Sequence, residues 1–501
     1  MSGWILLPVF LPVIVGAYLL CSSAVAKWKN QPEPDAAALR SLHTLTAIVL
    51  GVSAALAIIA AWSGDWTVTL FYLMKDIPVY FHIDDISRVF ATVISVIWFV
   101  ICIYSFVYMH HEGEEKRFFG FYLVVYGVLM ALCFSGNLVT MYLFYELMTL
   151  TSMPLVLHNG SREAIMAALK YLFYSMCGAY LGLFAIFFLY RYCDTLTFTA
   201  GGTLNLAAVD GHTALVLAAV FAALVGFGVK AGMLPLHAWL PAAHPVAPSP
   251  ASAALSGIIV KCGVLAVIRV VYYVVGPDFI RGTWVQTAWM TLALMTVFMG
   301  SMLAFREPVF KKRLAYSTVS QVSYILFGLS ALNPTAMTGA LLHVVFHAFI
   351  KSGLFLTAGI FIFQTGKTRV EELYGVGSRM PKTLWCYTFV SLALIGIPPT
   401  SGFISKWYLA QGALEANIGV YGWLGPVVLL ISALLTAGYL LQVTTKGFFP
   451  GKDAAEFDPS VGEAPRGMLV PLAFLAVMAV LFGIFPNPLV RFFGQIASTV
   501  M

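Results

Sequence analysis

The sequence predicts an all-α, polytopic membrane protein with about fourteen transmembrane helices. Two observations lead to this fold class. Of the 501 residues, 60% are hydrophobic and only 10% are charged, and the mean hydropathy is +0.89, far from the balance of a water-soluble domain. In addition, apolar runs of about 20 residues recur along the whole chain, and each is long enough to cross about 30 Å of hydrocarbon as a helix.

The apolar runs, taken in order, give the expected spans. The first starts at Trp4 with no basic region before it and no small-residue cleavage site after it, so we expect a retained span and not a signal peptide. The proline-rich stretch 234–248 is read as part of a broken helix or as a loop. The predicted spans are 4–26, 40–62, 85–109, 118–135, 137–158, 164–191, 213–233, 249–275, 284–305, 314–332, 336–364, 383–410, 420–445 and 467–490.

The basic residues between the spans predict the orientation of the chain. Six of the 28 basic residues fall within spans, and with the N-terminus outside, 17 of the others lie on the inner side and five on the outer side. The positive-inside rule therefore predicts a multi-pass protein of the inner (cytoplasmic) membrane with both termini on the outer side. The net charge of +6 then reflects topology and not a nucleic-acid surface. The lipid bilayer is the expected surrounding.

Cofactor chemistry is not predicted in this chain. The seven cysteines form no CxxC pair and lie in or beside apolar runs, as buried small residues do. The stretch "GFGVKAG" (226–232) has glycines, but it lies inside an apolar run with no strand before it, so it is no phosphate loop. We therefore expect no cofactor here and no redox centre.

Ionisable residues inside the spans are the candidate functional residues. Each costs about 2.5–3.5 kcal/mol to insert, so several together indicate a function, most simply a proton path. Arg269 lies near the outer end of its span and is expected to snorkel to the surface. Glu146 and Lys230 could also be a purely structural ion pair, but one such pair leaves the other lysines unexplained. The candidates are Glu146, Lys170, Lys230, Lys261, Lys351 and Lys406.

Two histidines extend this set. In "LLHVVFHAFIKSG", His343, His347 and Lys351 recur every four residues and therefore share one face of a helix. Imidazole titrates near neutral pH, which suits a proton relay. Metal binding is disfavoured, because no third histidine or carboxylate is near in sequence and the lysine repels a cation.

An internal repeat relates the two halves of the chain. Lys230 and Lys406 lie 176 positions apart, and each has a proline-rich interruption beside it, "MLPLHAWLPAAHPVAPSP" or "GIPPTSG". At an offset of 177, Lys170 corresponds to His347. Five spans in each half predict two inverted repeats, each with a broken helix. The predicted organisation is 1–116 with three helices, 117–275 and 284–445 as the repeats, and 446–501 as a loop and the last helix.

These motifs resemble the antiporter-like membrane subunits shared by respiratory complex I, Mrp-type cation/proton antiporters and membrane-bound hydrogenases. The resemblance covers nearly the whole chain and rests on "LFYELMTLTS", the lysine before "MLPLHAWLP", "KKRLAYSTVSQVSYI" and "GIPPTSGFISKW". It implies that Glu146 and Lys230 form the ion pair of the first half-channel and that Lys261 passes protons between the halves. It further implies that His343 and His347 continue the axis and that Lys406 ends it.

Three functions remain open on the sequence. The first is a proton-translocating subunit of a redox-driven complex, of the complex I or hydrogenase type. The second is the D-type subunit of a multisubunit Mrp-type Na⁺/H⁺ antiporter, and the third is a self-contained transporter for a small solute. The first two need other membrane subunits as partners and H⁺ or Na⁺ as the transported ion, because nothing in this chain supplies the driving energy.

Overall fold

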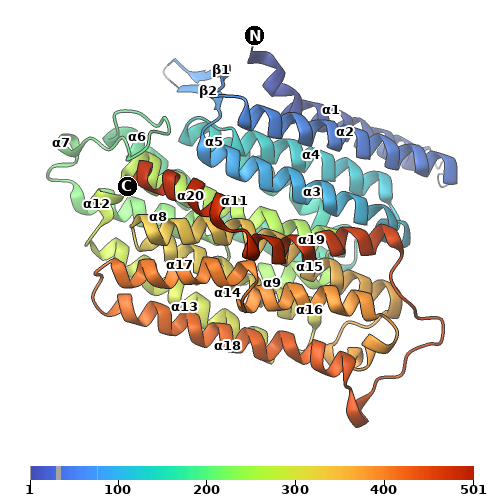
Figure 1. The fold of residues 1–501 in the computed structure, drawn as a ribbon. Helices are drawn as coiled ribbons and strands as arrows, with labels where there is room; N and C mark the ends of the chain where they lie inside the picture. The colour runs from blue at the N-terminus through green and yellow to red at the C-terminus, as the bar shows by residue number, and fades with distance from the viewer. Residues whose placement is uncertain (1, 30–34, 76) are drawn as a thin grey trace.

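The computed structural model describes residues 2–29, 35–75 and 77–501 as long helices that pack side by side (Figure 1). Both termini lie at the same end of these helices, together with a small hairpin. The long helices are α1 (Leu7–Trp28), α2 (Ala36–Trp62), α3 (Asp85–Glu112), α4 (Glu115–Cys133), α5 (Leu138–Val156), α6 (Arg162–Tyr192), α8 (Thr213–Lys230), α13 (Trp284–Arg306), α14 (Phe310–Ser330), α15 (Pro334–Thr365), α16 (Pro381–Ile395), α17 (Ser401–Glu415), α18 (Val420–Phe448), α19 (Arg466–Ile484) and α20 (Asn487–Val500).

Short elements connect them. These are η1 (Ser2–Leu6), α7 (Leu206–Val209), α9 (Leu240–Val246), α12 (Pro277–Ile280), η4 (Val370–Leu373), η5 (Val376–Ser378) and η6 (Gly451–Asp453). One further helix is composite, with α10 (Ser249–Ala254), the π-helical η2 (Leu255–Ile259), α11 (Val260–Ile268) and the π-helical η3 (Arg269–Val275) in one continuous run. We call this run, 249–275, the central helix.

The helical membrane fold is confirmed, and every predicted span is mostly helical, although 383–410 and 467–490 each contain a break. Within the described residues, eleven helices are long and apolar enough to cross a membrane. The three remaining predicted spans correspond to α5, to α14 and to the pair α16–α17. Because α16 and α17 have 15 residues each, neither alone could cross about 30 Å. The count of fourteen spans therefore stays a prediction.

Both predicted helix breaks are present. α8 ends at Lys230 and α9 begins at Leu240, so a proline-containing segment separates them. α16 ends at Ile395 and α17 begins at Ser401, with "GIPPT" between them. Helix ends leave backbone carbonyls without helical partners, and at membrane depth protein groups must satisfy them.

The hairpin at the end with the termini was not predicted. β1 (Thr67–Met74) pairs with β2 (Ile77–His82) in an antiparallel ladder. The stretch is rich in β-branched and aromatic residues, which suits strands, but the sequence analysis assigned it only to a connection between spans. Asn137 fastens the hairpin to the start of α5 by donating from Nδ2 to the Pro78 carbonyl at 2.7 Å.

The C-terminal region contains one helix more than expected. The last predicted span, 467–490, ends as a helix at Ile484, and a separate helix α20 follows after the turn Phe485–Pro486, with Pro488 in its first turn. Along α20 the buried residues Phe493, Ile496, Ala497 and Val500 recur at helical spacing and pack against α15. α20 is therefore amphipathic, with one apolar face, whereas a helix that crosses the membrane is usually apolar on all sides.

Arg269 does not snorkel, contrary to the sequence expectation. Its side chain is only 2% exposed and forms an ion pair with Asp84, at 2.5 Å from Nη1 to Oδ2 and 2.7 Å from Nη2 to Oδ1. Asp84 also caps α3 by accepting from the backbone N–H of Ser87. The guanidinium lies over the rings of Phe198 and Tyr273. The sequence analysis missed this pair because its partners are 185 positions apart.

Replacing Asp84 with asparagine should therefore destabilise the protein strongly. An uncompensated buried guanidinium costs about 3–5 kcal/mol. Burial alone would raise the pKa of the Asp84 carboxyl, but the Arg269 charge and hydrogen bonds outweigh burial and lower it to about 2. The pair's contribution is hence complete above the unfolded-state pKa and is lost as the pH falls toward 2.

Thermal unfolding in detergent between pH 5 and pH 8, where the pair is fully charged, measures this effect. Asp278→Asn is the matched control, because its ion pair with Arg281 is largely exposed and should contribute about 0–1 kcal/mol. Equal melting temperatures for the two variants would contradict a structural role for the buried pair.

Candidate functional site

The predicted site residues lie on two helices at the core of the bundle and on the helices that pack around them. The central helix is wholly buried within the protein, and residues 336–361 of α15 are buried as well. Lys261 lies on the central helix, and His343, His347 and Lys351 lie on α15. These four side chains therefore reach neither lipid nor bulk water directly.

Lys230 ends α8 in a pocket of hydroxyl groups. Its fully buried ammonium donates to Thr149 Oγ1 at 2.8 Å, Tyr171 OH at 3.1 Å and Ser175 Oγ at 2.9 Å. The Tyr171 ring centroid is 4.5 Å away and adds a cation–π contact. Three donors of an ammonium are thus matched by three neutral acceptors.

Tight packing of α6 on α8 places these hydroxyls. Gly178 of α6 and Gly226 of α8 face each other, and a Cβ on either would meet the other's carbonyl oxygen at 2.4–2.5 Å. Small residues at a membrane helix contact allow this close approach. Tyr171 and Ser175, both on α6, are thereby brought to Lys230.

Glu146 and Lys230 do not form the direct ion pair that the resemblance implied. No salt bridge of 4.0 Å or less joins them in the described part of the chain, and the Lys230 ammonium is bonded to hydroxyls. Glu146 lies on α5, half-buried, with a buried Oε1 that has no hydrogen-bond partner there. The two charges still interact through space. Hydroxyl groups therefore bind the Lys230 ammonium in place of the Glu146 carboxylate. The spacing of residues in the sequence could not predict this arrangement.

Lys261 faces a widened turn of the central helix. Its Nζ donates to the Ser256 carbonyl at 2.5 Å, in the π-helical segment η2. A π-helical turn shifts the backbone hydrogen-bond pattern and often marks functional sites. The Ser256 hydroxyl in turn is 2.7 Å from Thr318 Oγ1 of α14, so a polar connection leads from Lys261 to α14.

His343, His347 and Lys351 follow one buried face of α15, as predicted. The rings of the two histidines stack with centroids 5.6 Å apart, and the Lys351 Nζ donates to the Leu314 carbonyl at 3.0 Å. His343 Nδ1 is 2.9 Å from Ser405 Oγ on α17. Both ring nitrogens of His347 are buried without a hydrogen-bond partner among the described residues. Lys261 lies close enough to His347 and Lys351 for their positive charges, when present, to repel one another.

Lys406 binds the end of the broken helix. Its Nζ donates to the carbonyls of Leu394 at 2.6 Å and Ile395 at 2.9 Å, which are the last two residues of α16. The Tyr324 ring centroid lies 5.1 Å from the same nitrogen. The negative end of α16 therefore faces a cation, and Ser405 beside Lys406 connects this lysine to His343.

Lys170 is not part of this buried arrangement. It lies on the exposed face of α6 beside Tyr174, whose ring centroid is 5.9 Å from Nζ. The offset of 177 paired Lys170 with the fully buried His347, so the two positions have different environments. The remaining seven groups, of which Glu146 and Lys406 at the two ends are partly exposed and the other five are buried, are called the buried line: Glu146, Lys230, Lys261, Lys351, His347, His343 and Lys406.

Sequence reasoning missed several buried cationic or titratable residues, among them Lys311 and His244. Lys311 was assigned to a loop, yet it is 5% exposed and its Nζ donates to the Ala247 carbonyl at 2.5 Å. His244 is fully buried, stacks on Phe355 and has no hydrogen-bond partner among the described residues. The position of His244 within the proline-rich interruption 234–248 could have indicated that it is buried. Lys311 is followed by Lys312 and Arg313, and such a basic cluster is typical of an exposed loop, so its burial could not be predicted.

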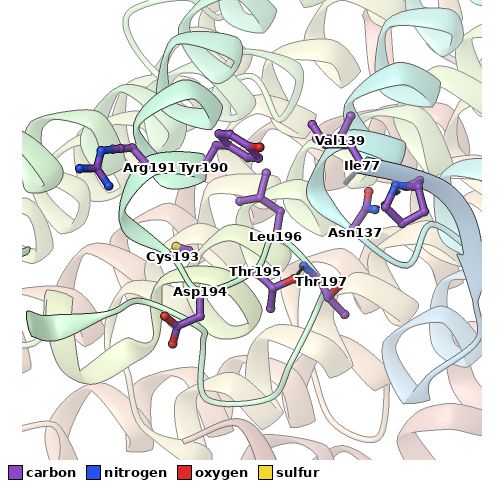
Figure 2. A pocket seen from close by; sticks show the side chains of 11 residues that line it. Ile77, Asn137, Val139, Tyr190, Arg191, Cys193, Asp194, Thr195, Leu196 and Thr197 are labelled. Atoms are coloured by element: carbon purple, nitrogen blue, oxygen red, sulfur yellow. Dashed lines mark hydrogen bonds between the residues drawn. The ribbon is translucent and has the colours of Figure 1, made fainter. Parts of the chain in front are cut away.

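A separate cavity of about 410 Å³ lies between the hairpin, α5 and the end of α6 (Figure 2). Its lining includes Asn137, Tyr190 and Thr197. In Figure 2 the Arg191 side chain points away from Asn137, and Asp194 points away from Tyr190. The two charged side chains therefore do not converge on a common ligand position.

Exposed and buried lysines should differ in their importance for ion flux. Lys351→Met should reduce flux by roughly 100-fold, the scale for losing a positioned proton-transfer group, because it interrupts the buried line. Lys170→Met should retain most of the wild-type flux, because Lys170 lies on the surface. The proton flux of each variant can be measured with a fluorescent pH probe in vesicles that contain equal amounts of protein. Equal loss in both variants would contradict this assignment.

A helical bundle with a buried row of lysines and histidines is typical of membrane proteins that carry an internal ion path. A family model described as "NADH:quinone oxidoreductase/Mrp antiporter, TM" matches residues 135–436. A second model, "NADH-Ubiquinone oxidoreductase (complex I), chain 5 N-terminus", matches residues 73–119. The chain belongs to the NADH:quinone oxidoreductase/Mrp antiporter transmembrane family.

Curated relatives come from three kinds of complex. The chain is 32% identical to NADH-quinone oxidoreductase subunit N of Desulforudis audaxviator, over 86% of this chain and 85% of that protein. It is 31% identical to hydrogenase-4 component B of Escherichia coli, over 80% of this chain and 62% of that protein. It is 27% identical to the D-type subunit of the Na(+)/H(+) antiporter of Bacillus subtilis, over 83% of each.

Solved structures share the fold. A chain of the Mrp complex from Dietzia sp. matches all of this chain and 98% of its own length, with a TM-score of 0.84 at 20% identity. A chain of respiratory complex I from Thermus thermophilus matches 98% of each, with a TM-score of 0.79 at 23% identity. At these identities the likeness concerns the fold alone.

Proposed function

We propose that this protein is the proton-translocating membrane subunit of a multisubunit, redox-driven complex of the complex I or hydrogenase type. The buried line carries this proposal. Lysines and histidines are costly inside a membrane, and here they recur from α8 through the central helix and α15 to α17, all of them buried except the partly exposed Lys406. A structural ion pair explains none of them, because the lysines bind hydroxyls and carbonyls and not carboxylates.

The proposed mechanism is electrostatic. Burial disfavours the charged form of an amine, whereas a nearby carboxylate favours it. Lys230 depends on neutral hydroxyls and on the more distant Glu146 charge, so a change in the charge or position of Glu146 would release or admit a proton at Lys230. Lys261, Lys351 and the two histidines would pass such a change along α15 to Lys406, whose carbonyl partners hold its charged form.

Two further features belong to the proposal. We infer two inverted repeats, 117–275 and 284–445, since each holds one broken helix with a membrane-embedded lysine beside it. We also infer an inner (cytoplasmic) membrane location with both termini outside, supported by the excess of basic residues on the opposite side. The shared end of the two termini in Figure 1 agrees with an even number of crossings.

A second candidate function is that of the D-type subunit of a multisubunit Na⁺/H⁺ antiporter. The similarity to the Bacillus subtilis antiporter protein favours it, since the match covers 83% of both chains. In both functions other membrane subunits are partners and H⁺ moves through the buried line. They differ in the driving force, which is either electron transfer or an ion gradient.

Purification of the tagged full chain from native membranes distinguishes the two functions. We expect copurified subunits that reduce a dye or quinone analogue, and reconstituted vesicles of that complex that acidify when reductant is added. Vesicles that exchange H⁺ only against an imposed Na⁺ gradient would overturn the redox function and support the antiporter. A chain that purifies alone and moves protons alone would overturn both.

A further inference from the structure

We propose that a pocket between the start of α2 and the end of α3 binds the phosphate group of an anionic phospholipid. The pocket has a volume of about 620 Å³. Its lining combines cationic or titratable side chains with apolar ones, namely Arg40, His43, His110 and His111 with Ala36, Leu39, Phe106, Val107 and Phe363. None of these residues belongs to the buried line, so the inference stands independently of the proposed function.

Glu115 organises the histidines of this pocket. Its side chain is only 5% exposed, and it pairs with His43 through one oxygen and with His110 Nδ1, at 3.0 Å, through the other. The His43 ring also stacks on Phe106 with centroids 4.7 Å apart. One carboxylate thereby holds two imidazoles from different helices at the same pocket.

Arg40 provides the permanent positive charge. It is exposed, and no carboxylate within the described residues lies within 4.0 Å of its guanidinium. Guanidinium stays charged at any physiological pH and binds phosphate through two parallel hydrogen bonds. Three further carboxylates adjoin the lining residues in sequence: Asp35 caps α2 by accepting from the Ala38 N–H, Glu114 pairs with Lys27 at 2.7 Å, and Glu112 is exposed.

The position of the pocket matches the lipid headgroup region. α2 has 27 residues and α3 has 28, so each is about 40 Å long and exceeds about 30 Å of hydrocarbon. Arg40 is the fifth residue of α2, and His110 and His111 belong to the last turn of α3. These side chains therefore lie where the helices leave the hydrocarbon, at the end of the bundle away from the termini (Figure 1).

The walls of the pocket are apolar. Leu39 of α2, Phe106 and Val107 of α3 and Phe363 of α15 line it beside the basic groups. A free phosphate ion would use only the basic rim, whereas a phospholipid places its headgroup on Arg40 and the start of its acyl chains against these apolar side chains. Basic pockets between membrane helices are known binding sites for anionic headgroups. The combination of basic rim and apolar walls therefore favours a lipid.

Lipid titration of the purified, delipidated complex that contains the full chain tests the proposal. We expect phosphatidylglycerol to bind more tightly than phosphatidylcholine, and Arg40→Gln to weaken phosphatidylglycerol binding by about five-fold, the loss expected for one basic residue at an anionic surface. Arg306→Gln, an exposed arginine at the end of α13, is the matched control and should leave binding unchanged. Native mass spectrometry counts the retained lipids.

Each other outcome overturns the proposal. Equal binding of phosphatidylcholine would show that charge is not recognised, and competition by millimolar inorganic phosphate would identify an ion site and not a lipid site. Equal affinity of the Arg40→Gln and Arg306→Gln proteins would remove Arg40 from the site. Melting temperatures without lipid verify that both variants are folded, and only the wild type and Arg306→Gln should gain stability from phosphatidylglycerol.

Discussion

Lys406→Arg is expected to abolish proton flux almost as completely as Lys406→Ala. Lys406 donates to the last two carbonyls of α16, and an arginine could keep a positive charge against the same helix end. A guanidinium, however, does not release its proton at physiological pH. If Lys406 must gain and lose a proton, flux in reconstituted vesicles should fall by roughly 100-fold or more in both variants.

The matched control for this experiment is Lys382→Arg. Lys382 lies in the first turn of α16 and is exposed, so its replacement tests the general effect of arginine on the same broken helix. Wild-type flux is expected there. Robust flux from the Lys406→Arg protein at equal protein levels would mean that charge alone is required at the break, and Lys406 would lose its role as a proton carrier.

The second large effect is expected at the other broken helix. Glu146→Ala and Glu146→Gln should abolish ion flux while the complex still assembles. Assembly should survive because Lys230 keeps its three hydroxyl partners, Thr149, Tyr171 and Ser175, when the carboxylate is removed. Flux should fail because the charge that acts on Lys230 through space is gone.

Lys230→Ala should also abolish flux, but with a greater loss of stability. It removes the donor shared by three hydroxyls; Thr149 and Tyr171 keep other hydrogen-bond partners, but Ser175 Oγ is left without one among the described residues, which costs about 1–3 kcal/mol. Complex yield and melting temperature must therefore accompany every flux measurement. Glu163→Gln, an exposed carboxylate in the first turn of α6, is the control. Wild-type pumping by a fully assembled Glu146→Ala complex would refute the switch between these two residues.

Periodicity and composition predicted the parts of this protein that depend on local sequence. A span is defined by about 20 apolar residues, so helices were found where runs such as 336–364 occur. The spacing of His343, His347 and Lys351 gave their common face directly, because helix geometry relates positions four apart. Prolines beside Lys230 and Lys406 predicted both helix breaks for the same local reason.

Tertiary structure decided which partner each buried group has. Lys230 and Glu146 looked like an ion pair, but close packing of Gly178 on Gly226 brings hydroxyls of α6 to the lysine first. Arg269 meets Asp84 across 185 positions, and Lys170 faces outward although its spacing matched His347. A side chain's type and helical face follow from local sequence, whereas its contacts depend on how distant helices pack, which no local pattern contains.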